Sequence, residues 1–167
     1  MKKTEVKFEE KTDNESLENN SINEKYISYY IASNENRIMV DINKYSKIKK
    51  PIIMPYGRVK KFFKDFKSKN IKDFGLQINE NKITLHNNYC SLPNSLVFGY
   101  AIASCIVGQA KNIYLVGFDG HDMEHSTQEE MLNMIRIFKG KFSKLNLISL
   151  TPTIYPITKS SIYAKNL

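Results

Sequence analysis

Polar and apolar positions divide the chain into a polar beginning and a longer part with recurring apolar runs. Residues 1–24 include KTDNESLENNSINE and carry almost nothing to bury, so we expect a disordered polar tail there. The apolar runs fall within residues 25–167, which we expect to form one folded domain. A chain of 167 residues, 41% of them hydrophobic, is long enough for one domain with a core and too short for two substantial ones.

The first half of this domain predicts short strands. The stretch YISYYIAS (26–33) is aromatic and β-branched, which favours a strand. The run PIIMPYG (51–57) lies between prolines and is typical of a buried strand. The segment between them, NRIMVDINKYSKIKK (36–50), fits either a further strand or a short helix.

The next segments predict a helix followed by two short strands. In RVKKFFKDFKSKN (58–70) apolar residues stand at 59, 62, 63 and 66, which is helical spacing. The stretches DFGLQI and KITLHN are joined through the polar NENK. This connection fits a hairpin or a loop between two short strands.

The second half alternates helices and strands. SLPNSLVFGYAIASCIVGQ (91–109) predicts a helix that is apolar nearly all round and therefore buried. Asn94 or Ser95 can cap its beginning, and Gly108 can end it in the left-handed conformation.

Two core strands, NIYLVGF (112–118) and LNLISL (145–150), enclose the amphipathic TQEEMLNMIRIFKGKF (127–142), which has acids in its first turn. The order helix, strand, helix, strand implies right-handed crossovers and parallel neighbours. We therefore predict an α/β, Rossmann-like three-layer fold with a mostly parallel sheet.

This topology predicts a binding site. In an open parallel sheet, ligands bind outside the carboxyl ends of the strands. The loops after the two core strands meet there, and the helix that begins near Ser95 adds unpaired N–H groups and a positive dipole end, which suit a phosphate. The candidate ligand-binding residues are Asn94, Ser95, Gly117, Asp119, Gly120, His121, Thr151, Thr153 and Tyr155.

Structural roles compete with ligand binding at each of these positions. Gly117 and Gly120 can simply supply turn conformations, and TPT (151–153) can provide turn chemistry at a strand end. Asp119 either caps the next turn or accepts hydroxyls of a sugar or ribose. The HDMEH stretch (121–125) has the composition of a metal cluster but no helical i,i+4 pair of ligands, so we predict no metal site. The sequence assigns no cofactor and no catalytic residue.

Charge is unevenly distributed. The net charge is +8, and residues 44–72 hold eleven Lys or Arg against one acid, Asp65. Such a block suits nucleic acid, an anionic membrane surface or a phosphorylated ligand. Lysines on a helix usually form its solvated face, and this is the interpretation that we favour for the block. Because the block has one arginine, no RNP-type aromatic motif and no zinc finger, we do not expect nucleic-acid binding.

Cysteine usage and hydropathy bear on the compartment. Cys90 and Cys105 are fifteen residues apart, and Cys105 lies in an apolar helical stretch, which argues against a disulfide framework, a zinc site or a nucleophile. The beginning of the chain has no apolar signal region, and the longest apolar segment, 96–108, is too short to span a bilayer. We expect a cytoplasmic protein without membrane insertion.

Four motifs carry a resemblance to a known family. They are C-x-LP (Cys90 to Pro93), GFDG (Gly117 to Gly120), E-M (Glu130 and Met131) and TPT-x-Y (Thr151 to Tyr155). In this order, and over residues 22–164, the chain resembles the C-terminal domain of the 4-hydroxy-2-oxovalerate aldolases found in bacterial surface-polysaccharide (O-antigen) gene clusters. In that family a barrel like that of HMG-CoA lyase precedes a Rossmann-like domain. More weakly, the core is similar to small bacterial sialyltransferases and to MptE-like pyrophosphokinases, which bind nucleotides.

The chain departs from this family in three ways. The aldolase barrel, with its metal ligands and catalytic residues, is missing, so the resemblance carries no aldol chemistry to any residue here. The strand and glycine-rich turn that usually open the related domains are unmatched, so we expect a sheet truncated at its N-terminal end and no phosphate-cradling loop. The position after GFDG, usually tyrosine in the family, is His121.

The resemblance implies a non-catalytic accessory domain of surface-polysaccharide biosynthesis that binds a nucleotide, sugar or phosphate. Its expected partners are an aldolase barrel subunit or a second copy, because a truncated sheet exposes an edge or an apolar face. The alternative is a small glycosyltransferase or nucleotide-sugar enzyme of the sialyltransferase type, with Asp119 and His121 acting on the donor. A nucleic-acid module on residues 44–72 would leave the GFDG and TPT loops unexplained.

Overall fold

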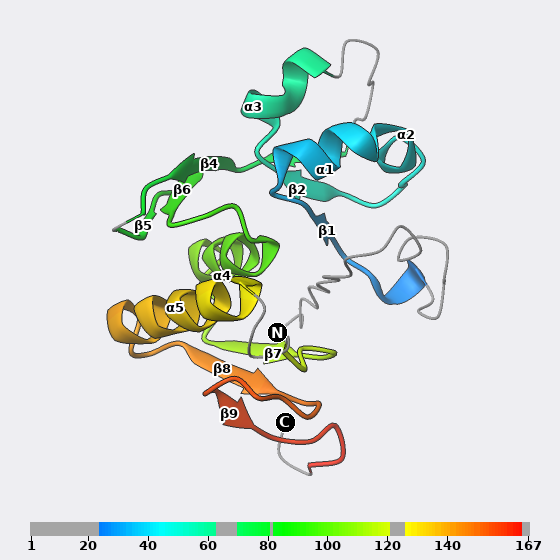
Figure 1. Cartoon of the computed structure of the whole chain (residues 1–167). Coiled ribbons are helices and arrows are strands. Elements are labelled where there is room, and N and C mark those ends of the chain that lie inside the picture. Colours follow the sequence, from blue (N-terminus) through cyan, green and yellow to red (C-terminus); the bar gives the residue numbers. More distant parts are fainter. Residues whose placement is uncertain (1–23, 63–69, 81, 121–125, 165–167) are drawn as a thin grey trace.

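The chain forms an α/β structure with three small sheets and helices interspersed among them (Figure 1). This computed structural model describes residues 24–62, 70–80, 82–120 and 126–164. The expected tail therefore lies outside the described residues, apart from its last residue. Two of the three sheets are entirely parallel, so the predicted α/β class is confirmed.

The first sheet belongs to the N-terminal part. Its parallel strands, in the order β1-β2-β3, are β1 (Tyr30–Ile31), β2 (Ile52–Met54) and β3 (Ile71–Asp73). The helical segments around it are η1 (Glu24–Tyr26), α1 (Glu35–Val40), α2 (Ile42–Tyr45), α3 (Tyr56–Val59) and η2 (Lys60–Phe62). The segment that fitted either a strand or a helix is therefore helical. Asn34 caps it, because its side chain accepts a hydrogen bond from the backbone N–H of Arg37 at 3.2 Å.

The second sheet combines both kinds of pairing. Its strands are β4 (Gly75–Ile78), β5 (Thr84–Leu85) and β6 (Tyr89–Leu92). Strand β4 pairs with β6 in parallel, and β5 pairs with β6 antiparallel. Strands β4 and β5 therefore do not form a hairpin with each other, and the hairpin is the next connection, where the N–H of His86 donates to the carbonyl of Tyr89 at 2.9 Å. The sequence pattern does not predict strand β6.

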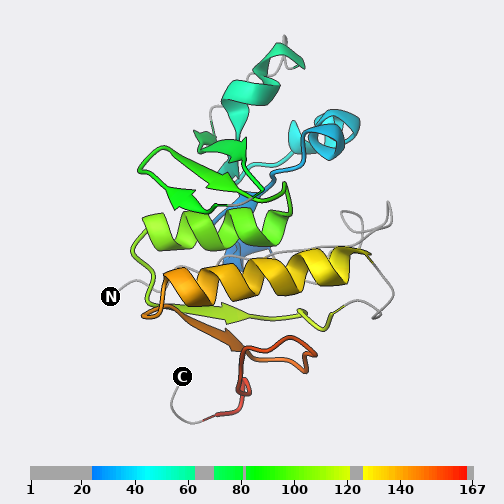
Figure 2. The same cartoon turned by 60° about the vertical axis from the view of Figure 1, so that its left-hand side comes forward.

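The third sheet carries the predicted core strands. Its parallel strands, in the order β7-β8-β9, are β7 (Asn112–Leu115), β8 (Asn146–Ser149) and β9 (Thr158–Lys159). Ile113 lies opposite Leu147 in the β7–β8 pair. Two long helices, α4 (Val97–Val107) and α5 (Ser126–Lys141), pack side by side along the sheet (Figure 2). The parallel β7–β8 pair and both helices are as predicted.

Helix α4 is buried, as its apolar sequence predicts, but both of its ends differ from expectation. Its cap is Leu96, which has no side chain suited to capping, and Asn94 instead accepts a hydrogen bond from the N–H of Leu96 at 3.2 Å. Gly108 has φ −74°, and Gln109 takes the left-handed conformation with φ +64°. The two hydrogen bonds at this end, from Gln109 N to Ile106 O and from Ala110 N to Cys105 O, both 2.9 Å, form a Schellman motif one residue later than expected.

Two clusters of buried residues hold the sheets together. The smaller contains Ile38, Ile52 and Met54 and packs the first sheet against its helices. The larger contains residues of the second and third sheets, α4 and α5. Ile31 of β1 and Ile53 of β2 pack against the larger cluster, so the first sheet contacts both. Instead of the expected single sheet, the chain uses the segment between β3 and α4 for the separate β4-β6-β5 sheet.

In the described part of the chain, no helix is both long and apolar enough to cross a membrane.

Candidate functional site

The predicted site residues follow the carboxyl ends of β7 and β8. Figure 2 shows that the N-terminal ends of α4 and α5 lie on the same side of the molecule as the carboxyl end of β7. This is the arrangement expected at the ligand-binding edge of a parallel sheet. The loop after β7, the loop after β8 and the beginning of α4 therefore come together, as the sequence predicts.

A hydrogen bond joins the two loops directly. The N–H of Gly117 donates to Oγ1 of Thr151 at 3.0 Å. Gly117 has φ +68°, a conformation that glycine adopts at little cost and that turns the chain at the end of β7. The hydroxyl of Ser149, a fully buried residue, donates to the carbonyl of Thr151 at 2.8 Å. Thr151 therefore accepts one hydrogen bond at its side-chain hydroxyl and another at its backbone carbonyl.

A second contact lies beyond Gly117. Gly120 has φ +116°, and a Cβ at this position would lie 2.6 Å from Cδ1 of Ile154. The carbonyl of Asp119 accepts a hydrogen bond from the N–H of Ile154 at 3.0 Å. Gly120 is thus required both by its conformation and by the close approach of the TPT loop.

Aromatic rings connect these loops to α4. Phe118 stacks on Phe98 of α4, with ring centroids 4.6 Å apart and planes at 15°. Its centroid also lies 4.6 Å from that of Tyr155. Phe118 therefore joins the GFDG loop to α4 and to the segment after β8, a role that the sequence did not reveal because an aromatic residue at a strand end has no distinctive spacing.

The residues Thr153 and Tyr155 are buried in the interior. Their exposed fractions are 7% and 1%. Oγ1 of Thr153 accepts a hydrogen bond from the N–H of Tyr155 at 3.2 Å, the turn chemistry considered for TPT. A ligand at the surface would therefore meet Thr151, which is half-buried, before it met Thr153 or Tyr155.

The beginning of α4 has two partners that the sequence did not indicate. Ser33, buried just beyond β1, donates from its hydroxyl to the carbonyl of Ser95 at 2.7 Å. Nδ2 of Asn94 donates to Oε2 of Glu130 in the first turns of α5 at 3.3 Å. Ser33 is the last residue of the predicted strand stretch 26–33, so the rule that ligands bind at strand ends would have found it.

Asp119 is the exposed acid of the site. No side-chain hydrogen bond or ion pair of Asp119 is present among the described residues, so the structure does not choose between a capping carboxylate and one that binds hydroxyls. His121 lies outside the described residues.

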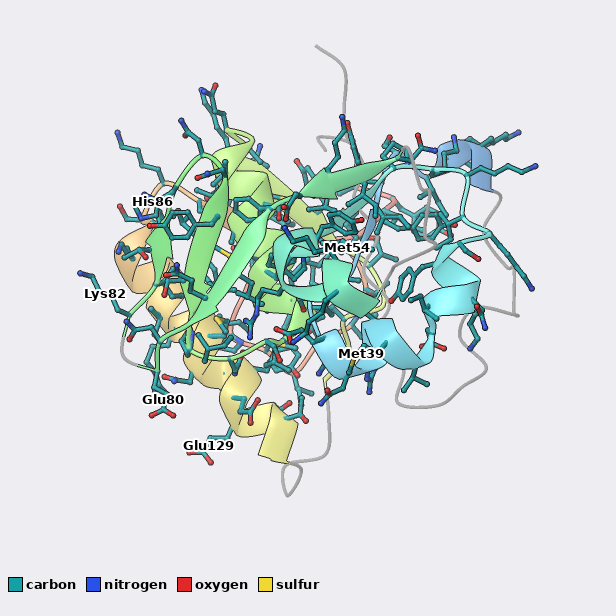
Figure 3. All side chains as sticks on the ribbon, turned by 90° about the horizontal axis from the view of Figure 1, so that it is seen from above. Met39, Met54, Glu80, Lys82, His86 and Glu129 are labelled. Atoms are coloured by element: carbon teal, nitrogen blue, oxygen red, sulfur yellow. The ribbon has the colours of Figure 1, made fainter. Side chains whose placement is uncertain are left out.

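Among the described residues the histidine is His86, which lies near the C-terminal end of α5. Glu129 lies at the other end of that helix (Figure 3).

Groups with clearly raised pKa values belong to the interior. Burial raises the pKa of the Cys90 thiol to about 12 and that of Cys105 to about 11. Burial also raises the pKa of the Tyr100 hydroxyl, which donates to the carbonyl of Phe74. In α2, burial and the nearby Asp41 raise the pKa of Tyr45 to about 12. All four groups are held protonated at neutral pH, and none belongs to the predicted site.

No group of three or more His, Cys, Asp or Glu side chains within the described ranges is placed to hold a metal ion. Comparisons of the chain with models of protein families, with curated proteins and with solved structures find no match. The resemblance to the aldolase-associated domain therefore stays a prediction from the motifs themselves.

Proposed function

We propose that this chain binds a nucleotide, a sugar or a phosphate at the carboxyl ends of β7 and β8. The observation that carries the proposal is the hydrogen bond from Gly117 N to Thr151 Oγ1, which joins the loops of two adjacent parallel strands at one edge of the sheet. This bond holds Gly117 against Thr151 without any ligand. A site that needs no ordering on binding loses less conformational entropy and binds more tightly.

The same residues favour recognition of hydroxyl groups as much as phosphate. The exposed carboxylate of Asp119 can accept hydrogen bonds from a sugar or ribose. Glu130 beside Asn94 adds a second carboxylate near the beginning of α4. Two acids weaken the attraction of this helix end for a bare phosphate, so a nucleotide sugar or a sugar phosphate with free hydroxyls fits better than inorganic phosphate.

The strand order supports a Rossmann-like arrangement of the whole chain. Starting from its far edge strand, the first sheet has the order β3-β2-β1. The third sheet has the order β7-β8-β9. In Figure 1 the labelled strands of these two sheets follow one another from top to bottom as β2, β1, β7, β8 and β9. Placed edge to edge, the two separate sheets would have the order 3-2-1-4-5-6 of a doubly wound sheet, and the ligands of such a sheet bind where the order reverses, here between β1 and β7. Ser33 and Gly117 follow these two strands.

The biological role that we propose is that of a non-catalytic accessory domain of an aldolase in surface-polysaccharide biosynthesis. The support for this role is the C-x-LP, GFDG, E-M and TPT-x-Y series. In this role the chain works beside a barrel subunit or a second copy.

A thermal-shift screen tests binding directly. The purified chain is heated with CMP, UDP and GDP sugars, free nucleotides and inorganic phosphate. A ligand at a hundredfold excess over its Kd stabilises by about 2.7 kcal/mol, which raises the melting temperature by roughly 5–10 °C. Asp119→Asn should abolish the shift. The control is Asp41→Asn, which removes the same charge from Asp41, the ion-pair partner of Lys44 at the beginning of α2. This variant should leave the shift intact.

The glycosyltransferase alternative makes a different prediction, which an assay of product release tests. The exposed Asp119 carboxylate favours it, because a donor-binding acid must be accessible. Release of CMP from a CMP-sugar, lost in His121→Ala, would replace the accessory role with an enzymatic one. Absence of any thermal shift with all ligands would overturn both proposals and leave GFDG as a structural turn.

A further inference from the structure

The segment between β1 and β2 carries the chain back to the amino end of the first sheet. Helix α1 follows the carboxyl end of β1, and α2 and a short loop then lead into the amino end of β2 (Figure 1). The two strands are parallel, and the N–H of Tyr30 donates to the carbonyl of Pro51 at 2.9 Å, so their amino ends lie side by side. Residues 40–50, which end this segment, therefore lie towards the edge opposite to Ser33, which follows the carboxyl end of β1.

Residues 40–50 concentrate positive charge. They hold four lysines, Lys44, Lys47, Lys49 and Lys50, against one acid, Asp41, which gives a net charge of +3. Asp41 is already engaged, because its carboxylate lies 3.0 Å from Nζ of Lys44. Lys47 and Lys49 are exposed, and neither side chain has a hydrogen bond or ion pair within the described ranges. These two cations are therefore available to an external anion.

Three of these lysines do not belong to a helix. Lys47, Lys49 and Lys50 lie in the turn and loop between α2 and β2. The turn is held by backbone hydrogen bonds from Lys47 N to Lys44 O at 3.0 Å and from Ile48 N to Tyr45 O at 3.2 Å. The interpretation of the basic block as the solvated face of a helix therefore does not apply to these three lysines.

An exposed apolar side chain lies beside the cations. Val40, the last residue of α1, is 79% exposed, whereas Ile38 of the same helix is fully buried in the smaller core cluster. Val40 directly precedes Asp41, the ion-pair partner of Lys44, so it borders the basic segment. Val40 and the four lysines together form a surface that we call the lysine edge.

The composition of the lysine edge distinguishes between two anionic partners. Nucleic acids are bound through arginine forks on phosphates and through aromatic rings that stack on bases. The lysine edge has no arginine, and the ring of the nearby Tyr45 packs against the smaller core cluster instead of facing outward. Clusters of about four to eight basic residues are attracted to anionic lipid headgroups, and the region below the headgroups accepts apolar side chains such as that of Val40. An anionic membrane surface therefore fits the lysine edge better than a nucleic acid does.

We propose that the lysine edge docks the chain on an anionic membrane surface, with its lysines at the headgroups and Val40 entering the interface. The candidate ligand site borders the opposite edge through Ser33, so a docked chain keeps this site open to the solution. Because the attraction acts between charges at a surface, it is reversible and screened by salt. The proposal does not depend on the proposed function or on the identity of any ligand.

Co-sedimentation of the full chain with lipid vesicles tests the proposal. The chain should bind vesicles made of equal parts phosphatidylglycerol and phosphatidylcholine and should leave vesicles of pure phosphatidylcholine unbound. Binding should fall steeply as salt rises from about 0.05 M to about 0.5 M, because the screening length shortens. Equal binding to both kinds of vesicle, or no binding to the anionic ones at low salt, would overturn the proposal.

Two matched double variants separate the lysine edge from the net charge of the chain. Lys47→Gln with Lys49→Gln should weaken partitioning onto the anionic vesicles roughly twentyfold, since each lysine near such a surface contributes about fivefold. Lys60→Gln with Lys159→Gln removes the same charge from exposed positions in η2 and β9 and should change partitioning less than about twofold. All four side chains are exposed, so the fold should persist in both variants. Equal losses in the two variants would show that only net charge matters and would contradict the proposal.

The apolar contact and the choice of partner have tests of their own. Val40→Ser should lower vesicle binding several-fold, whereas Val116→Ser, at a valine 60% exposed just beyond β7, should not. Equal effects of the two serine variants would count against insertion of Val40. A mixed-sequence oligonucleotide should bind more weakly than the anionic vesicles at the same salt. Tighter binding of the oligonucleotide, lost in Lys47→Gln with Lys49→Gln, would assign the lysine edge to nucleic acid and overturn the membrane assignment.

Discussion

At the residue scale, the two glycines of GFDG have left-handed backbones but different surroundings. Gly117 has φ +68°, and a Cβ there would meet nothing within 4 Å. Gly120 has φ +116°, and a Cβ there would collide with Ile154. Alanine at Gly117 therefore tests the backbone alone, and alanine at Gly120 tests the backbone together with the contact between the loops.

We predict that Gly117→Ala lowers the free energy of unfolding by about 1–2 kcal/mol, the cost of a left-handed L-residue. Gly120→Ala should cost more, because the exposed side chain of Ile154 must move away from the added Cβ. Urea denaturation of both variants measures the difference. In the double variant Gly120→Ala with Ile154→Ala, the loss of unfolding free energy that the contact causes should disappear. If this loss persists, the collision with Ile154 is not its cause.

Gln109 occupies a position that suits glycine. It follows α4 with φ +64°, and both hydrogen bonds of the Schellman motif are present around it. Gln109→Gly should raise the free energy of unfolding by roughly 0.5–1 kcal/mol, because glycine adopts this conformation without the Cβ penalty. Gln109→Ala should be nearly neutral by the same urea measurement. Destabilisation by glycine would show that the side chain of Gln109 contributes more than its strained backbone costs.

At the scale of elements, the packing of α4 on α5 depends on a missing side chain. A Cβ on Gly99 would lie 2.8 Å from Cε and 2.9 Å from Sδ of Met134. Met134 is almost fully buried, so its side chain has little room to move. This close approach allows both long helices to lie along the same sheet.

Gly99→Ala should destabilise the chain by about 1 kcal/mol, because overpacking outweighs the gain in helix propensity. Combined with Met134→Ala, its effect should be smaller than the sum of the single effects, with a coupling of roughly 0.5–3 kcal/mol. The matched control is Gly140→Ala in α5, where a Cβ meets nothing within 4 Å. It should stabilise by up to about 1 kcal/mol, and an equal loss at both glycines would contradict the packing argument.

At the scale of the whole molecule, the buried thiols report on the integrity of the core. Cys90 of β6 is fully buried in the larger core cluster, whereas Cys105 of α4 is partly exposed. Thiolate is the reactive form of cysteine, and burial raises the pKa of both thiols. Their reactivity therefore depends on both pH and unfolding.

We predict that Cys90 reacts with a thiol reagent at pH 8 only when the chain unfolds, and that Cys105 reacts first. Thiol titration with and without urea, using Cys90→Ala and Cys105→Ala to assign each phase, measures this order. Above about pH 9 the unfolded chain releases thiol protons that the folded chain retains up to about pH 12, so the free energy of unfolding should fall as pH rises through this window. Equally rapid reaction of both thiols in the folded chain would argue against the packing around β6.

The sequence predicted well those elements whose pattern is long and regular. The all-apolar run of α4, the amphipathic run of α5 and the core strands β7 and β8 were each recognisable because burial selects side chains over several turns or alternations. The short elements were less predictable. Strand β6 contains the polar but buried Ser91, and β9 has two exposed residues, so neither carries a pattern that burial would impose.

The sequence by itself determined the α/β class and brought the GFDG and TPT loops to one end of the sheet, because parallel crossovers place successive strand ends on the same side. Only the tertiary structure decided how these residues are used. It placed Thr153 and Tyr155 inside, joined Gly117 to Thr151 and added Ser33 and Phe118, because these contacts link residues from distant parts of the chain. It also divided the strands into three sheets, since strand pairing depends on contacts across the fold that local side-chain periodicity does not encode.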